Sequence, residues 1–367
     1  MKELYTIENV DSISSPSIVV YTDLVIENIE KAIAIIGNKQ NLRPHIKTNK
    51  TKEICELLKT RNIDKFKAST IAECDLLGQI QAKDCLLAYQ LTPDKFQRFI
   101  NLILNYKETH YSSVFDNIKN LYAYNEILVE KNLTGYIYID INVGMNRTGI
   151  DPENVISFFE EANAFSNIVI EGFHIYDGHI RESNIEKRIP IIDDLFNNVD
   201  EKICAISKNY GKDFKIVAGG SPSFPVHALR KNVECSPGTF VFWDWKYENI
   251  LPDLPFQCAL LVVTRISSII NDELICLDLG HKSIASENPF PRVEFLNIDV
   301  QEWVSQNEEH LVIRVKSTKK MQIGDVIYCI PQHVCPTVAL HQDMKVIKDN
   351  RYIGEWKVVA RNRKLVF

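Results

Sequence analysis

The sequence predicts an α/β protein: a (β/α)8 TIM-like barrel with a second, mostly antiparallel β domain. Over about residues 17–242, short runs of β-branched and apolar residues alternate with longer amphipathic segments, which is typical of repeated βα units. After about residue 245 the runs are short and strand-like, and turns rather than helices separate them. We therefore expect a barrel over 15–245 and a β-rich domain over 246–367 that also includes residues 1–14.

Eight strands are expected in the barrel, and each is followed by a helical segment. The candidate runs are 41–46, 65–69, 84–89, 111–115, 136–141, 168–176, 214–218 and 233–236. Their number and alternation favour a closed barrel. A doubly wound open sheet has the same local pattern, and periodicity alone does not separate the two architectures.

Several helices have recognisable starts. Thr70 and Glu73 form a capping-box pattern, and Thr92 and Asp151 each stand before a proline that suits a first helical turn. Residues 182–209 carry isoleucines, a leucine and a phenylalanine at helical spacing, which predicts a long amphipathic helix.

The second domain is predicted from short strand-like runs divided by turn residues. These runs are 256–268, 273–279, 311–315, 326–330, 344–346 and 357–360. The domain would span roughly a hundred residues or more, which is enough to form its own hydrophobic core.

Composition narrows the class of protein. Of the 367 residues, 45% are hydrophobic and 25% are charged, which is globular and excludes collagen-like or disordered chains. The net charge of −6, without a lysine- and arginine-rich stripe, argues against nucleic acid and anionic membranes as partners. The nine cysteines are odd in number and irregularly spaced, which indicates free thiols in a reducing compartment. The first residues lack the apolar core of a signal peptide, so we expect a soluble, cytoplasmic protein.

Polar residues gather where the predicted barrel strands end, which is where barrels place their active sites. Lys47 follows the first strand and Gln90 the third, Arg147 lies in a glycine-containing loop after the fifth, and Tyr176 ends the sixth. A lysine at such a place can lose solvation and form a Schiff base with an aldehyde. On residue type alone, however, a lysine at the start of a loop is more often solvent-exposed.

Glycine-rich segments follow the seventh and eighth strands. They contain Gly219, Gly220 and Ser221, and then Gly238 and Thr239. Glycines allow backbone N–H groups to approach a phosphate, and the loops after strands seven and eight often bind one in barrels. The alternative is a pair of tight turns without a ligand.

Together, the lysine and the phosphate loops suggest pyridoxal phosphate as the cofactor. Arg147 would then hydrogen-bond to or stack on the cofactor ring, and Tyr176 would contact the ring or the phosphate. Taken singly, each is more often a structural loop side chain.

In the second domain, His333 and Cys335 form a candidate metal pair. On an extended chain alternate residues share a face, so both side chains could bind one ion. A nitrogen and a thiolate suit zinc, with water or substrate as further ligands. The alternative is a buried cysteine beside an ordinary histidine, and the other eight cysteines are expected to be buried thiols.

Taken in order, the motifs of this chain resemble those of the D-threonine aldolase and D-serine dehydratase family of fold-type III pyridoxal phosphate enzymes, whose barrel is like that of alanine racemase. The resemblance extends from about residue 15 to 340. The segments that carry it are 43–50 (Arg-Pro-His-Ile-Lys-Thr-Asn-Lys), 144–149, 176–179, 219–221, 236–240, 277–283 and 331–337.

The resemblance implies roles for the candidate residues. Lys47 would hold the cofactor covalently and act as the base at the substrate Cα. Tyr176 and Arg147 would contact the cofactor, and the glycine loop 219–221 would hold its phosphate. Gln90, Gly238 and Thr239 are further candidate cofactor contacts.

The resemblance also implies that His333 and Cys335 bind a divalent metal, probably zinc, which engages the substrate β-hydroxyl, and that the chain forms a homodimer. Asn49 departs from the family, in which a histidine often occupies this segment after the lysine.

The family implies a metal-dependent lyase acting on D-3-hydroxy amino acids. Because His-x-Cys is the dehydratase-like pair, β-elimination to a 2-oxo acid and ammonia is favoured, as in a D-serine dehydratase. One alternative is retro-aldol cleavage to glycine and an aldehyde, as in a D-threonine aldolase. Others are a metal-independent amino-acid racemase and a non-catalytic carrier of the cofactor.

Overall fold

The computed structural model describes residues 3–367, so the first two residues of the predicted segment 1–14 lie outside the described part. The chain divides into two compact units. The barrel unit comprises residues 32–47, 54–238 and 362–367, and the β-rich unit comprises the residues up to 31, 48–53 and 239–361. The predicted domain bounds, 15–245 for the barrel and 246–367 with 1–14 for the β-rich domain, stay a prediction.

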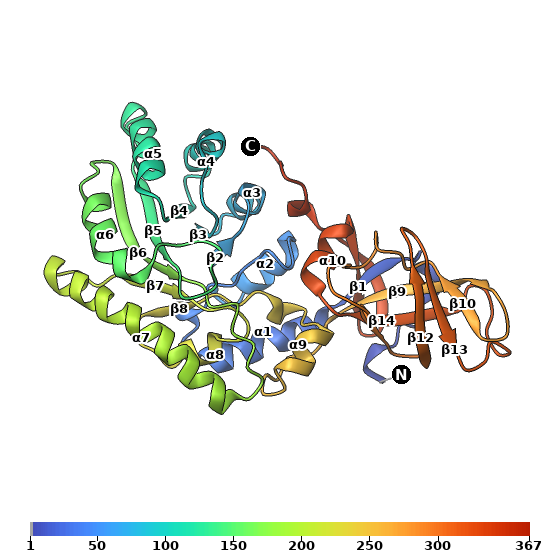
Figure 1. The fold of residues 1–367 in the computed structure, drawn as a ribbon. Coiled ribbons are helices and arrows are strands. Elements are labelled where there is room, and N and C mark those ends of the chain that lie inside the picture. Colours follow the sequence, from blue (N-terminus) through green and yellow to red (C-terminus); the bar gives the residue numbers. More distant parts are fainter. Residues whose placement is uncertain (1–2) are drawn as a thin grey trace. The chain divides into compact units, whose positions relative to one another are not determined.

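A parallel sheet forms the barrel unit, with helices on its outer side (Figure 1). Its strands lie in sequence order: β2 (Lys65–Ala68), β3 (Asp84–Leu87), β4 (His110–Phe115), β5 (Gly135–Ile141), β6 (Ile168–Ile175), β7 (Lys215–Ala218) and β8 (Val233–Cys235). The helices that follow them include α3 (Ile71–Gln79), α4 (Pro93–Asn105), α5 (Ile118–Glu130), α6 (Val155–Asn163), α7 (Ile185–Tyr210) and α8 (Phe224–His227). The alternating pattern therefore reports βα units, as predicted.

Residues 42–46 close this sheet into a barrel. Leu42 bridges Cys235 at the end of β8, and His45 bridges Lys67 in β2, both in parallel orientation. The expected first strand is thus a pair of isolated bridges rather than a regular strand, because residues 39–41 form a 3-10 helix and a proline interrupts the segment. Contact with both edges of the sheet excludes the open doubly wound alternative.

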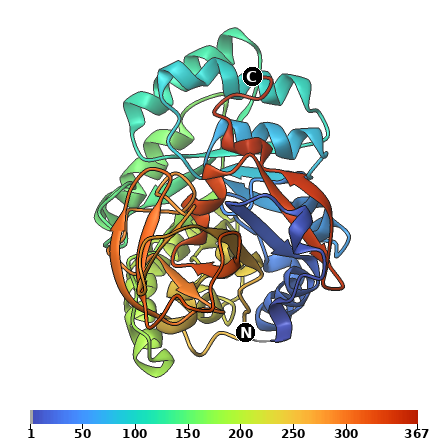
Figure 2. The ribbon, with the colours of Figure 1, turned by 90° about the vertical axis from the view of Figure 1, so that its right-hand side faces the viewer.

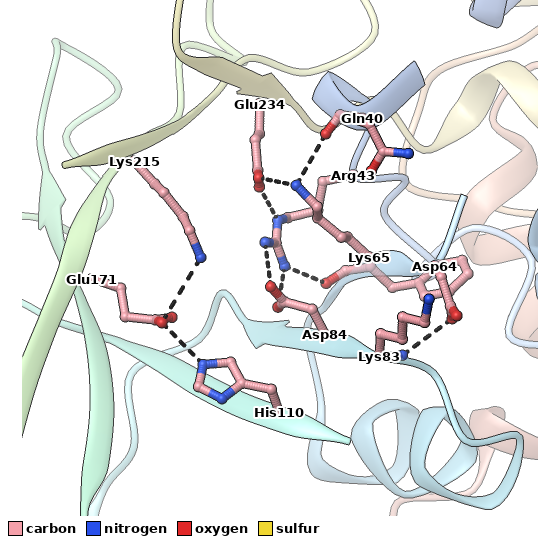
Figure 3. A network of polar contacts seen from close by, with 11 residues as sticks. Gln40, Arg43, Asp64, Lys65, Lys83, Asp84, His110, Glu171, Lys215 and Glu234 are labelled. Carbon is pink, nitrogen blue, oxygen red and sulfur yellow. Dashed lines mark hydrogen bonds and ion pairs between the residues drawn. The ribbon is translucent and has the colours of Figure 1, made fainter. Parts of the chain in front are cut away.

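The segment 42–46 is fixed by ion pairs that we call the Arg43 cluster: Arg43, Asp84 and Glu234 (Figure 3). The buried Arg43 guanidinium donates to both Asp84 oxygens at 2.5 and 2.9 Å and to a Glu234 oxygen at 2.6 Å. Burial alone would lower the pKa of Arg43, but the two carboxylates outweigh burial and raise it. The cluster ties the closing segment to β3 and β8.

Apolar side chains fill the barrel interior. Leu86, Val114, Tyr138 and Val217, from four different strands, pack into one cluster and are almost completely buried. Parallel barrel strands are buried on both faces, which explains why they read as continuous apolar runs in the sequence.

The β-rich unit contains a mostly antiparallel sheet in the order β12-β13-β10-β9-β1-β15-β16, with β14 paired to β9 and β11. Its strands are β1 (Ser17–Tyr21), β9 (Leu260–Ile269), β10 (Leu274–Leu277), β11 (Val293–Phe295), β12 (Val300–Gln306), β13 (Leu311–Val315), β14 (Val326–Pro331), β15 (Asp343–Lys348) and β16 (Arg351–Lys357). The remaining helices of the chain are α1 (Thr22–Ile36), α2 (Lys52–Lys59), α9 (Trp245–Ile250) and α10 (Val334–Leu340).

Strand β1 comes from the N-terminal part of the chain but lies between β9 and β15 in this sheet, which the sequence did not predict. It pairs in parallel with β15 and antiparallel with β9, so the blue N-terminal strand lies beside red C-terminal strands in Figure 2. The run 357–360, expected to be a strand, instead follows β16 and enters a 3-10 helix at 359–361. The predicted architecture of a barrel plus a mostly antiparallel domain is nevertheless confirmed.

Some predictions for single residues are confirmed and others are wrong. Thr70 caps α3 as expected, accepting from the Glu73 N–H at 3.1 Å, whereas Thr92 makes no capping hydrogen bond to α4. Cys204 is exposed on α7, which corrects its prediction as a buried thiol, and all nine cysteines are free. Within residues 3–367 no helix is both long and apolar enough to cross a bilayer.

Candidate active site

Three cationic side chains surround the Tyr176 ring in the barrel unit, and we call these four residues the Tyr176 cluster. The Arg147 guanidinium lies 4.9 Å from the ring centroid, and the Lys47 and Lys67 amines lie at 5.6 and 5.5 Å. Such cation–π contacts are attractive. The structure therefore brings together three residues predicted from different strand ends, and adds Lys67, which was not predicted.

Lys47 stands in a turn directly after the segment that closes the barrel. Its side chain is half-buried, and its backbone N–H donates to His45 Nδ1 at 3.3 Å. It is therefore neither fully solvated nor ion-paired in the part of the chain described, which suits an amine that must react with an aldehyde.

The glycine loop after β7 passes close to the Tyr176 cluster. Gly219 has a left-handed φ of +76°, and a Cβ there would lie 2.9 Å from His227. A Cβ on Gly220 would lie 3.2 Å from the Tyr176 ring. Only glycine leaves the backbone open here, so the loop has the form of a cradle for an anionic group.

Asp177 fixes this glycine loop through hydrogen bonds. It accepts from Ser223 Oγ at 2.6 Å and from His227 Nε2 at 2.8 Å, and the Gly220 N–H donates to Ser223 Oγ at 3.1 Å. Burial would raise the pKa of Asp177, but the hydrogen bond from His227, the charge of His227 and the hydrogen bond from Ser223 together hold the pKa below its usual value. Asp177 was part of a recognised motif, but sequence reasoning gave it no task.

Gln90 joins two acidic residues at the barrel mouth. Its amide nitrogen donates to Asp116 at 3.0 Å and to Asp140 at 2.8 Å, and Asp140 also accepts from His174 Nδ1 at 2.7 Å. The Gln90 carbonyl oxygen is buried and has no hydrogen-bond partner within residues 3–367. An orphaned acceptor of this kind fits a site that receives a ligand donor.

A cavity of about 440 Å³ opens among these side chains, a size suited to a small molecule. Its lining residues are His45, Lys47, Ser69, Ala88, Tyr89, Gln90, Thr92, Asp140, Arg147, Thr148 and His174. Lys47, Gln90 and Arg147 thus share one hollow, as their positions at strand ends predict.

Lys67 is the residue that sequence reasoning missed. It is the third residue of β2, 1% exposed, and its amine donates to Ser236 Oγ and lies 3.4 Å from His174 Nε2. Burial and the nearby Lys47 lower its pKa to about 7. The available signal was a lysine inside a strand whose two faces are both buried in a barrel.

The predicted residues after β8 are buried but differ in their surroundings. Ser236 Oγ donates to the Gly219 carbonyl at 2.9 Å, which links the two glycine segments. Gly238 ends this part of the barrel unit, whereas Thr239 begins a 3-10 helix of the β-rich unit, with its hydroxyl 3.7 Å from Cys335 Sγ.

In the β-rich unit, His333 and Cys335 adjoin each other for a reason other than the one predicted. The extended backbone ends at His333, which is the N-cap of α10, and Cys335 lies in the first turn of that helix. Pro336 favours a helix start at this point, which overrides the strand pattern. His333 hydrogen-bonds to Cys335, and its Nδ1 lies 2.5 Å from Glu287.

The His333 and Cys335 pair has the donor chemistry of a zinc site but supplies only two ligands. Thr48 Oγ1 lies 3.1 Å from Cys335 Sγ, and Thr48 follows Lys47 in the sequence. No group of three or more histidine, cysteine or acidic side chains within residues 3–367 is placed to hold a metal. An ion on this pair would therefore complete its coordination with water or substrate.

Two family models match the chain. Residues 20–217 match the family described as alanine racemase, N-terminal domain, and residues 259–347 match the putative serine dehydratase domain. The chain is 23% identical to D-serine dehydratase of Dictyostelium discoideum, over 95% of this chain and 98% of that protein. These matches confirm the resemblance predicted from the motifs.

Solved structures show the same fold. D-threonine aldolase from Filomicrobium marinum superposes with a TM-score of 0.83 at 20% identity, covering 95% of each chain. D-threo-3-hydroxyaspartate dehydratase from Delftia sp. HT23 superposes with a TM-score of 0.80 at 15% identity, covering 94% of this chain and 97% of that one. Variants of that dehydratase replace with alanine a histidine, or a cysteine two positions after it, and the cysteine variant is described as metal-free.

Proposed function

Because the chain belongs to the alanine racemase N-terminal domain family, we propose that it is a pyridoxal phosphate- and metal-dependent lyase acting on D-3-hydroxy amino acids by β-elimination. The observation that carries the proposal is the Tyr176 cluster beside the glycine cradle: an amine, a cation over an aromatic ring, and open backbone for a phosphate. The products would be a 2-oxo acid and ammonia, as from a D-serine dehydratase.

The residues present fit the cofactor. Lys47 would hold its aldehyde carbon, Gly219, Gly220 and Ser221 would bind its phosphate, and Tyr176 and Arg147 would contact its ring. The orphaned Gln90 oxygen, with Gly238 and Thr239, would supply further polar contacts. When bound, pyridoxal phosphate withdraws electrons from the Cα of an amino acid.

The chain's own groups would then move the protons. Lys47 would take the proton from the substrate Cα, because its amine is half-buried and carries no ion pair within the described residues. Arg147 would neutralise negative charge on the cofactor, since its guanidinium is held over Tyr176.

His333 and Cys335 would hold a divalent metal, for which their nitrogen and sulfur donors suit zinc, and this metal would assist departure of the substrate β-hydroxyl. The His-x-Cys spacing supports this part of the proposal, because the dehydratase variants described above alter a histidine and a cysteine at the same spacing. Retro-aldol cleavage is the second candidate, favoured by the likeness to D-threonine aldolase. We also expect a homodimer in the cytoplasm.

Product analysis tests the reaction. With pyridoxal phosphate and zinc, D-serine should give pyruvate and ammonia, and D-threonine should give 2-oxobutyrate. Glycine with acetaldehyde from D-threonine would establish aldol cleavage instead. Turnover of neither substrate, together with interconversion of D- and L-alanine, would establish a racemase.

Two sets of variants test the site. Lys47→Ala should abolish the visible absorbance of covalently bound cofactor, whereas Lys52→Ala, which replaces an exposed lysine at the start of α2, should keep it.

His333→Ala or Cys335→Ala should lose bound metal and most lyase activity but retain that absorbance, and Cys329→Ala should retain both the metal and the activity. Unchanged metal content in both variants of the pair would refute the metal assignment.

A further inference from the structure

Lys67 lies in the Tyr176 cluster without an anionic partner. Its amine contacts the Ser236 hydroxyl and the His174 ring, and it forms no ion pair with any carboxylate within residues 3–367. At 1% exposure it is also cut off from water. A buried ammonium in this position is costly, so a chain keeps it only where something compensates.

The hydrogen-bond direction at His174 shows how the amine is oriented. His174 Nδ1 lies 2.7 Å from the Asp140 carboxylate, which can only accept, so this nitrogen carries the proton. Burial lowers the pKa of His174 and favours the neutral ring. Its Nε2 is then an acceptor, and Lys67 donates to it.

An ammonium has three N–H donors, and Lys67 uses two of them, to His174 and to Ser236. Ser236 passes its own proton to the Gly219 carbonyl, so Lys67 stands next to the phosphate cradle as well as next to the Tyr176 ring. The third N–H donor of Lys67 therefore has no hydrogen-bond acceptor within residues 3–367. The cofactor would bind in this region and could supply that acceptor.

We propose that Lys67 donates this third hydrogen bond to the ring nitrogen of pyridoxal phosphate, which makes it a second cofactor-binding lysine beside Lys47. The inference rests on the proposed function. In the cofactor, the ring nitrogen lies opposite the aldehyde carbon, so a ring held through Lys47 needs a separate partner at its nitrogen. Lys67 approaches the same tyrosine ring as Lys47 but comes from β2, and it carries a free donor.

The titration of Lys67 suits this task. Its lowered pKa, caused first by burial and then by Lys47, means that the empty site holds the amine near its point of deprotonation. A ring-nitrogen acceptor would stabilise the ammonium, and the ammonium would in turn oppose protonation of the ring nitrogen. The phosphate is the competing acceptor, and the experiment separates the two.

The test compares two ligands and three proteins. Dissociation constants of pyridoxal phosphate, and of its analogue with CH in place of the ring nitrogen, are measured by fluorescence for the apo forms of the wild type, Lys67→Met and Lys65→Met. Lys65 is the matched control, since it lies two residues earlier in β2 and pairs with Glu234 at 2.5 Å. Lys67→Met should weaken pyridoxal phosphate about 10- to 100-fold and leave the analogue unchanged; Lys65→Met should change neither.

Equal weakening of both ligands would place Lys67 on the phosphate or in a structural role and overturn the inference. An unchanged affinity for pyridoxal phosphate in Lys67→Met would also overturn it. Failure of the wild type to bind either ligand would instead reject the proposed function. If Lys67→Met does not fold, Lys67→Gln and the ¹⁵N chemical shift of the labelled ring nitrogen in the wild type provide the same decision.

Discussion

The barrel unit contains two clusters of cations, each with one fully buried member, Arg43 in one and Lys67 in the other, and they differ in their counter-charges. In the Arg43 cluster, each of the three guanidinium nitrogens donates to a carboxylate, and one of them also donates to the Phe66 carbonyl. In the Tyr176 cluster, three cations face one aromatic ring, and the direct hydrogen-bond partners of Lys67 are a hydroxyl and an imidazole. The protein itself supplies the counter-charges of the Arg43 cluster, whereas Lys67 in the Tyr176 cluster pairs with no carboxylate within residues 3–367.

This difference distinguishes a cation that stabilises the fold from a cation that binds a ligand. A buried cation that is fully paired contributes to closing the barrel, and removing it would strand the carboxylates around it. A buried cation without a counter-charge weakens the folded state, and its presence is explained only by a ligand that it meets. Substitutions in the two clusters should therefore change stability in opposite directions.

The largest effect is expected for Arg43→Met. Loss of the guanidinium leaves Asp84 and Glu234 buried close together, with Lys65 as a partner for Glu234 alone. We expect the free energy of unfolding of the apoprotein to fall by about 3–5 kcal/mol. Urea unfolding followed by circular dichroism measures it, with Lys215→Met, whose side chain is nearly half exposed, as a control that should change little.

The pH dependence sharpens this prediction. Burial raises the pKa of Asp84 and of Glu234, but Arg43, helped by Lys65 at Glu234, outweighs burial and holds both below their usual values. Their stabilisation is therefore present above about pH 4–4.5 and is lost as pH falls through the lowered values. Arg43→Met should lose this acid-dependent step, and an identical acid profile for both proteins would show that the cluster does not stabilise the barrel.

The comparison also shows how far the sequence can predict the structure. Barrel strands such as β5 were predictable because burial on both faces favours a run of apolar and β-branched residues. The pairing of β1 was not, since its apolar pattern suits either sheet and pairing partners far apart in sequence leave no local signal.

Within the site, the places of Lys47, Arg147 and Tyr176 at strand ends predicted that they lie near one another, as they do, and their roles stay a proposal. Lys67 was not predicted, because alternation in a strand does not reveal whether the face carrying a lysine points into a barrel. The spacing of His333 and Cys335 predicted neighbouring side chains on an extended chain, whereas Cys335 lies in the first turn of α10, where Pro336 favours a helix start, and their metal site stays a proposal.

An intermediate effect of opposite sign is expected for Lys67→Met. Burial and Lys47, with a smaller contribution from Arg147, lower the pKa of Lys67 to about 7, while Asp140 and Asp177 oppose them. In the unfolded chain this amine titrates near 10.4, so the wild type gains stability as pH rises from about 7 to 10. Lys67→Met should be more stable than the wild type by about 1–2 kcal/mol at pH 7.

The gap should narrow towards pH 10, because the unfolded wild type then also loses the proton. Apoprotein unfolding in urea at pH 7 and pH 9.5 measures both points. A Lys67→Met protein that is several kcal/mol less stable at pH 7 would mean that Lys67 is a structural group like Arg43.

The smallest effect concerns His110 at the edge of the Arg43 cluster (Figure 3). Its Nε2 lies 3.0 Å from Glu171, and that hydrogen bond, aided by Asp84 and opposed by burial and Lys215, raises the pKa of His110. The stabilisation is therefore complete below about pH 6.5 and is lost as pH rises through the raised value. His110→Phe retains an aromatic ring against Tyr136, whose centroid is 4.4 Å away, and removes the charge together with the hydrogen bond to Glu171.

Because the His110 side chain is about a third exposed, solvent screens the pair, and we expect His110→Phe to lose no more than about 1 kcal/mol at pH 5.5. At pH 8.5 the variant and the wild type should be equally stable. A loss that is the same at both pH values would trace the effect to packing on Tyr136 rather than to charge, and it would limit the ion-paired structural cluster to Arg43 and its two carboxylates.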